Sequence, residues 1–336
     1  MKHNLITLIK ILISLFMLWF LVHTSKLQFS LLLDLFQSPL LLFGTLSIYY
    51  MVVAISAWRW QKLNDAQQIH LSYRRTLLPT YLGIAFNNLL PGSVGGDFFR
   101  FYFLRKHLSV KRSSVMLSIL FDRITGLLGI FIAVCLVSIP YLDRLSHQKL
   151  TLYFIFICIS FSFGVAALYF ASLLLPQKIG LSAFLNHRYA DNKWVKAVLS
   201  FLDAIRVYRN SKITIIKCLF ASLIVQALIA ISCMLIAKML QFPGFSIMDY
   251  ILAIAVTQIV NLIPIAPGGI GVGEIAFANV LALLNPGVSG SFATIFLAYR
   301  IIGIVTYLPG IAIFVFNKKA GLVNALFARN PTNNEI

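Results

Sequence analysis

The sequence predicts an all-α polytopic membrane protein: an inverted repeat of two halves, with six full transmembrane helices and two re-entrant helical hairpins. Three observations lead to this fold class: an apolar composition, six long apolar stretches, and a motif that occurs twice inside broken apolar segments. Sixty per cent of the 336 residues are hydrophobic and 11% are charged, whereas a soluble domain carries about a quarter charged residues. We expect one membrane domain over residues 1–336.

Six stretches are apolar enough over their length to cross a hydrocarbon core of about 30 Å. Two shorter apolar segments are interrupted by glycine and proline, and each of their arms, about 10–14 residues long, is too short to cross alone. Lipid cannot replace the backbone hydrogen bonds lost at such breaks, so we expect re-entrant hairpins buried in protein, with full crossing as the alternative. The spans are 5–23, 39–58, 115–139, 151–175, 213–238 and 292–316, and the hairpins 77–104 and 250–285.

The placement of lysine and arginine predicts the orientation. Under the positive-inside rule, basic stretches and both termini lie on the cytoplasmic side of a bacterial inner membrane. The first repeat then covers about residues 5–139 and the second about 151–316, and their hairpins enter from opposite faces. The basic stretches are 59–75, 100–112, 176–212 and the C-terminal tail, while the linkers 24–38, 140–150 and 239–249 carry few or no basic residues.

The cytoplasmic linker 176–212 contains apolar residues at helical spacing, framed by lysine and arginine. The pattern includes Trp194, Val198, Leu202 and Ile205. It predicts an amphipathic helix in the lipid head-group layer. A connecting helix packed on the spans explains the same pattern.

The net charge of +18 is consistent with attraction to anionic lipids or an anionic substrate, and the positive-inside rule explains most of it. We expect no nucleic-acid partner, because the chain has no basic soluble domain. The four cysteines lie in apolar segments without a Cys-x-x-Cys pair, and the six histidines lack ligand spacing. We therefore expect no metal site and no cofactor.

The repeated motif lies in the two broken segments, at residues 88–97 and 261–274. Each glycine-rich run ends in a carboxylate, Asp97 or Glu274, and an arginine follows 26 residues later, Arg123 or Arg300. Charges at membrane depth cost about 2.5–3.5 kcal/mol each, and an unpaired buried charge costs more than a paired one. We therefore expect two ion pairs, Asp97 with Arg123 and Glu274 with Arg300.

Two roles fit these pairs. The guanidiniums and the free N–H groups of the half-helix N-termini can bind a phosphate, with the carboxylates orienting the arginines or exchanging protons. Alternatively, the pairs clamp the hairpins and do nothing else. Asp122 points about 100° away from its neighbour Arg123 on a helix and need not pair with it. We expect Arg100, near the cytoplasmic interface, to snorkel towards water.

The residues around the breaks also have structural explanations. Glycine permits positive φ and close helix packing. Two roles are open to Asn87, Asn88, Gln258 and Asn261, to bind substrate or to satisfy the opened backbone, and we expect the second. The transport-site candidates are Asn88, Gly92, Gly95, Gly96, Asp97, Arg100, Arg123, Asn261, Gly268, Gly269, Gly271, Gly273, Glu274 and Arg300.

These motifs resemble those of the lysylphosphatidylglycerol synthase transmembrane-region family, also called flippase-like membrane proteins. The resemblance rests on residues 88–100, 122–126 and 267–274 with Arg300, and spans about residues 5–320. It implies movement of a polar lipid between leaflets, with membrane phospholipids as partners. Related synthases carry a cytosolic aminoacyltransferase domain that this sequence lacks, so we expect no synthase activity and allow a separate lipid-modifying enzyme as partner.

The predicted function is therefore that of a lipid flippase or translocase for an anionic or aminoacylated phospholipid or another lipid-linked head group. A membrane-embedded transferase, with Asp97 or Glu274 as general base, is one alternative. A small-solute transporter on the same scaffold is another. A closed polar cavity would favour the solute transporter, and lateral grooves between spans would favour lipid.

Overall fold

The computed structural model of the protein describes residues 12, 15–24, 27–89, 95–107, 112–139, 160, 164, 208, 211–263 and 266–320. Within these residues the regular structure is helical and no strand occurs. In this described part of the chain, four helices are long and apolar enough to cross a membrane. They are α2 (Pro39–Ala66), α5 (Arg112–Ser138), α10 (Lys212–Met239) and α13 (Ala293–Ala320).

These four helices confirm the predicted spans 39–58, 115–139, 213–238 and 292–316 as helices, with shifted ends. The largest shift is in α2, which continues to Ala66 and therefore carries Arg59 inside the helix. Residues 15–23 of the first predicted span are helical. The predicted span 151–175 and the amphipathic helix of the linker 176–212 lie outside the described residues, apart from isolated positions.

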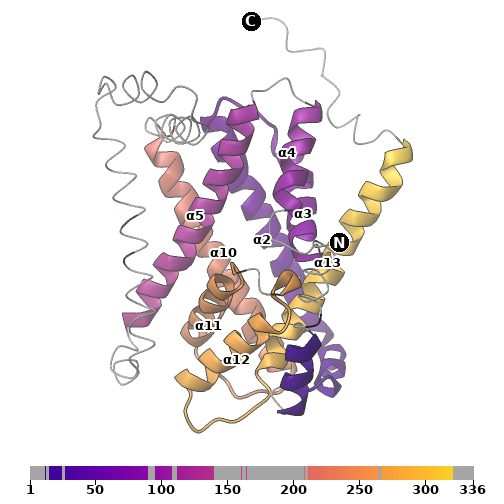
Figure 1. Ribbon diagram of the computed structural model, residues 1–336, viewed down its shortest axis with the longest axis vertical. Helices are drawn as coiled ribbons and strands as arrows, with labels where there is room; N and C mark the ends of the chain where they lie inside the picture. The colour runs from indigo at the N-terminus through magenta and orange to yellow at the C-terminus, as the bar shows by residue number, and fades with distance from the viewer. Residues whose placement is uncertain are drawn as a thin grey trace, which may run out of the picture.

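The remaining helices are shorter, and four of them form two packed pairs. The first pair occupies the predicted hairpin 77–104 and the second the predicted hairpin 250–285. Figure 1 shows the first pair towards one end of the molecule and the second towards the opposite end. The first pair is α3 (Tyr73–Leu89) with α4 (Gly95–His107), and the second is α11 (Ile247–Val260) with α12 (Val272–Leu284); η1 (Ser30–Gln37) and η3 (Pro267–Gly269) are 3-10 turns.

Local chemistry explains where several helices begin. Pro39 stands at the first position of α2, where its missing N–H leaves no hydrogen bond unmade. A capping box starts α11: the Ser246 hydroxyl accepts from the backbone N–H of Met248, and the Asp249 carboxylate accepts from the N–H of Ser246. Such reciprocal bonds satisfy donors that the first helical turn leaves unpaired.

Helix α10 lies at the centre of the packing and contacts α2, α5, α11 and α13. The largest core cluster joins α10 to the second half, with Phe277, Phe292 and Cys233 buried in it. Large apolar side chains also lie on the outside: Leu40 is 81% exposed and Ile213 70% exposed. Exposed apolar surface of this kind is typical of helices that face lipid.

Candidate functional site

The first helix pair is closed by two glycines that face each other. A Cβ atom on Gly96 of α4 would overlap the carbonyl group of Gly83 on α3, so the two backbones approach as only glycine allows. The Asn87 side-chain oxygen accepts a hydrogen bond from the N–H of Gly96 at 2.8 Å. This confirms that Asn87 satisfies backbone opened at the break.

The first predicted ion pair is present. Arg123 Nε on α5 lies 2.7 Å from Asp97 Oδ2 in the first turn of α4. The Arg123 side chain is 35% exposed and that of Asp97 16%. The pair therefore ties α4 to the long helix α5 while part of the Arg123 side chain stays accessible.

A second carboxylate, that of Asp122 on α5, binds two further arginines. Arg59 Nε of α2 lies 2.8 Å from its Oδ1, and Arg100 Nη1 of α4 lies 3.0 Å from its Oδ2. Arg59 Nη1 also donates to the Ser222 hydroxyl of α10 at 2.8 Å, and the Arg100 guanidinium lies 5.0 Å from the centre of the Trp60 ring. Four helices thus meet around the buried Asp122 carboxylate. Asp122 lies about 15 Å from the start of α5, at a helical rise of 1.5 Å per residue.

Two expectations about this region are wrong. Arg100 does not snorkel: it is 5% exposed, because Asp122 and the Trp60 ring hold its guanidinium inside. Arg59 is not a loop residue, because α2 continues past it and buries it. Sequence reasoning missed Arg59 and Ser222 as site residues. The available signal was Asp122, a carboxylate in a predicted span that needs a cation from elsewhere in the chain.

The second broken segment folds around Glu274. Gly268, Gly269 and Gly271 all have positive φ, at 59°, 69° and 85°, a conformation that glycine adopts without steric cost. The tight turn they form leads into α12, where Glu274 Oε2 accepts from the N–H of Gly271 at 2.6 Å. The carboxylate therefore occupies the N-terminus of its own helix.

Arg300 of α13 completes this arrangement. Its Nε lies 2.8 Å from Glu274 Oε1, which confirms the second predicted ion pair. Its Nη1 donates to the carbonyl oxygen of Gly268, and its Nη2 to that of Gly269 at 2.9 Å. All three guanidinium nitrogens thus contact oxygens of the same hairpin.

Glycine at position 273 makes room for this guanidinium. A Cβ there would lie 2.6 Å from Arg300 Nη2 and 2.8 Å from Asn261 Nδ2. A Cβ on Gly269 would overlap the side-chain oxygen of Asn261, which is buried without a hydrogen bond from any described residue. The expectation that Asn261 satisfies the opened backbone is therefore wrong for this oxygen, although the residue does cap α11.

The other predicted polar residues are placed as follows. Gln258 on α11 exchanges two hydrogen bonds with Gln226 on α10, at 3.1 and 3.2 Å, and so joins helices, not the break. Asn88 lies in the last turn of α3, and Gly95 is the first residue of α4. Gly92 falls outside the described residues.

Within the described part of the chain, His, Cys, Asp and Glu form no group that could hold a metal ion.

The two halves differ in how far their charges are satisfied. The second half holds one guanidinium against one carboxylate and two backbone carbonyls. The first half holds three guanidiniums, from Arg59, Arg100 and Arg123, against two carboxylates, from Asp97 and Asp122. Among the described residues, Arg59 and Arg100 therefore share one carboxylate, whereas Arg123 has Asp97 and is the most exposed of the three arginines.

Long apolar helices with ion pairs buried between them define a multi-pass integral membrane protein. The chain belongs to a known family of such proteins: the family model described as lysylphosphatidylglycerol synthase TM region matches residues 7–310. A search of curated proteins finds no match. Family membership agrees with a lipid-related membrane function.

Proposed function

We propose that this protein is a lipid translocase that moves an anionic phospholipid between the leaflets of the bacterial inner membrane. The observation that carries the proposal is the first-half cluster, with three guanidiniums against two carboxylates. The concentration of guanidiniums on these helices gives a positive potential that attracts an anion. A lipid phosphate meets that potential, and arginine binds phosphate through paired N–H groups.

Arg123 is the residue that we propose contacts the phosphate. Its side chain is 35% exposed, against 11% for Arg59 and 6% for Arg100. Asp97 orients its guanidinium through Nε. Arg59 and Arg100, held by Asp122, add positive potential from behind without direct contact.

Glu274 and Arg300 have a structural role in this proposal. Arg300 already contacts Glu274 and two hairpin carbonyls with its three nitrogens. A phosphate at that position would have to displace backbone hydrogen bonds that lipid cannot replace. Of the two roles that the sequence left open, the clamp therefore fits the second half and the phosphate contact fits the first.

The arrangement of the helix pairs supports an alternating-access mechanism. The pair α3–α4 and the pair α11–α12 lie towards opposite ends of the molecule (Figure 1). We propose that these pairs are re-entrant hairpins of an inverted repeat with both termini cytoplasmic, a scaffold whose halves can rock around a central site. The lipid tails would stay in the bilayer while the head group crosses.

A lateral groove favours lipid over a small solute. An apolar groove of about 590 Å³ opens between α2 and α10, lined by Ile55, Phe220 and Ile224 among others. Such a groove between spans accommodates an acyl chain, whereas a small polar solute gains nothing from it.

The test is leaflet exchange of fluorescent phosphatidylglycerol in proteoliposomes, measured by dithionite quenching. We expect the wild-type protein to accelerate lipid exchange. Arg123→Gln should slow the exchange about tenfold or more, because a charged hydrogen bond is lost. The control Arg74→Gln changes an exposed residue of α3 and should leave the rate unchanged. Wild-type protein that accelerates exchange of no anionic, zwitterionic or glycosylated lipid would overturn the proposal. Mass spectrometry of the same vesicles separates translocation from a transferase, which would change the lipid covalently.

A further inference from the structure

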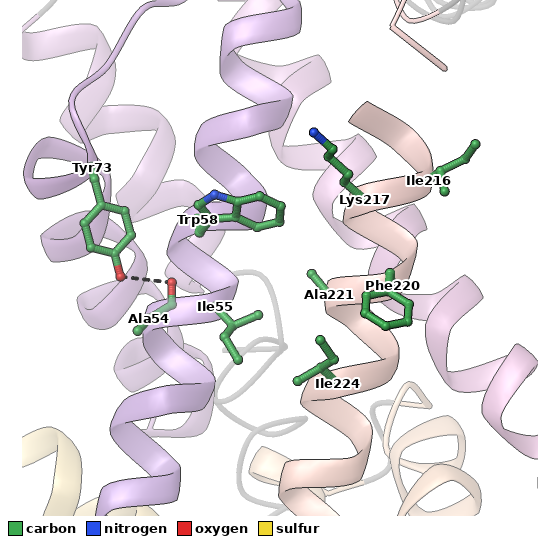
Figure 2. Close-up of a pocket in the computed structure, with 9 residues that line it drawn as sticks. All are labelled: Ala54, Ile55, Trp58, Tyr73, Ile216, Lys217, Phe220, Ala221 and Ile224. Atoms are coloured by element: carbon green, nitrogen blue, oxygen red, sulfur yellow. Dashed lines mark hydrogen bonds between the residues drawn. The ribbon is translucent and has the colours of Figure 1, made fainter. Parts of the chain in front are cut away.

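The groove between α2 and α10 has two chemically different zones. Figure 2 shows Ile55, Ile224 and Phe220 along its lower part and Trp58 and Lys217 at its upper end. Tyr73 of α3 borders the same end and donates a hydrogen bond to the carbonyl oxygen of Ala54. The groove is therefore an apolar channel with a cation at one end.

Lys217 has no carboxylate partner among the described residues. Every ion pair found there involves other cations. The Lys217 side chain is exposed and lies about 7.5 Å from the start of α10, at 1.5 Å per residue. Lysine near the end of a transmembrane helix extends its ammonium towards the lipid phosphates.

We propose that this groove binds an anionic phospholipid, with one acyl chain between α2 and α10 and the phosphate at Lys217. The volume of about 590 Å³ lies within the range of about 300–1,000 Å³ for small-molecule sites. Ile216 and Phe220 are each 65% exposed beside it, so the groove opens directly to the surrounding acyl chains. Trp58 and Tyr73 frame the cationic end, as aromatic residues do at the head-group level.

The groove and the first-half charge cluster lie back to back on the same two helices. On α2, Trp58 lines the groove while its neighbour Arg59 pairs with Asp122. On α10, Ala221 lines the groove while Ser222 accepts from Arg59. A lipid in the groove is therefore one helix face away from the buried arginines. The claim that a lipid enters the transport path from this groove rests on the proposed function. The claim that the groove binds a lipid does not, and it is measured separately.

The test compares lipid binding by variants of the full chain in detergent. The thermal midpoint is recorded with added phosphatidylglycerol and with phosphatidylcholine of identical chains, and co-purified phospholipid is quantified by mass spectrometry. Lys217→Gln removes the cation. Lys212→Gln removes a charge from the same helix outside the groove. Ala54→Trp and Ile224→Trp fill the groove, and Ile213→Trp adds the same bulk outside it.

We expect phosphatidylglycerol to raise the midpoint of the wild type more than phosphatidylcholine does. Lys217→Gln should lower the affinity for phosphatidylglycerol about fivefold, as expected for one lysine at a lipid surface, while Lys212→Gln should bind like the wild type. At least one groove-filling tryptophan should reduce retained lipid, and Ile213→Trp should not. Equal stabilisation by both lipids, or wild-type binding by Lys217→Gln, overturns the inference.

The leaflet-exchange assay keeps this inference apart from the proposed function. Suppose that Lys217→Gln binds less lipid but exchanges lipid at the normal rate. The groove is then a binding site, but it is not the position from which lipid enters the transport path. A wild type that binds phosphatidylglycerol through Lys217 without exchanging any lipid rejects the translocase and leaves the binding site standing. Normal exchange with no Lys217-dependent binding rejects this inference alone.

Discussion

Arg100 and Asp122 form a buried ion pair between α4 and α5, with Arg100 Nη1 3.0 Å from Asp122 Oδ2. Both residues are almost fully buried, and Asp122 also binds Arg59 of α2 through its other oxygen. The pair therefore fixes the short helix α4 to two long helices. The Asp122 carboxylate therefore links α4 of the first helix pair to both α2 and α5.

Asp122→Asn should be among the most destabilising single changes in the chain. It leaves Arg59 and Arg100 buried without a counter-charge, and removal of one partner of a buried ion pair costs about 3–5 kcal/mol. Chemical denaturation in detergent micelles measures the loss. Asp97→Asn is the comparison, because its partner Arg123 is 35% exposed and water can solvate its side chain after the carboxylate is lost. Similar losses for both variants would contradict this view of the cluster.

Gly96→Ala should force α3 and α4 apart. The added methyl group overlaps the Gly83 carbonyl, which as backbone cannot rotate away. Overpacking of this kind costs about 1–3 kcal/mol, and the unfolding midpoint in micelles measures it. Gly244→Ala meets no atom within 4 Å and should stay within about 0.5 kcal/mol of the wild type. A fully stable Gly96→Ala protein would show that the backbones do not approach as described.

Arg300→Lys should destabilise the second hairpin although it keeps the positive charge. Lysine cannot contact Glu274, the Gly268 carbonyl and the Gly269 carbonyl together, because it lacks the planar fork of the guanidinium. The lost charged hydrogen bonds are worth about 1.5–3 kcal/mol. Faster proteolysis or amide hydrogen exchange around residues 266–275 would report the opening. An Arg300→Lys variant with wild-type protection there would refute the clamp.

Gln226 and Gln258 should behave as a coupled unit. Gln226→Leu leaves the Gln258 amide unsatisfied between α10 and α11, at a cost of about 1–3 kcal/mol. Gln226→Leu with Gln258→Leu removes both polar groups and should restore most of the stability. A double-mutant cycle measures the coupling, expected at about 0.6–1.7 kcal/mol within a membrane. Additive losses would show that the two amides do not interact.

The predicted ion pairs of Asp97 with Arg123 and Glu274 with Arg300 could be read from the sequence because the same spacing occurs twice inside apolar segments. A repeated local pattern, combined with the cost of buried charge, leaves few possible partners. The same holds for the helical spans 39–58, 115–139, 213–238 and 292–316, because crossing a hydrocarbon core requires a long apolar stretch.

The sequence by itself determined the helical membrane class, the positions of the broken segments and the two ion pairs within the repeats. Only the tertiary structure decided that Arg59 and Arg100 share Asp122, that Arg300 binds two carbonyls of its own hairpin, and that a groove with Lys217 at its end lies between α2 and α10. The physical reason is the distance along the sequence over which each effect acts. Hydropathy and spacing act along one segment, whereas Arg59 meets Asp122 across 63 residues and Ser222 across 163, through helix packing that no local pattern encodes.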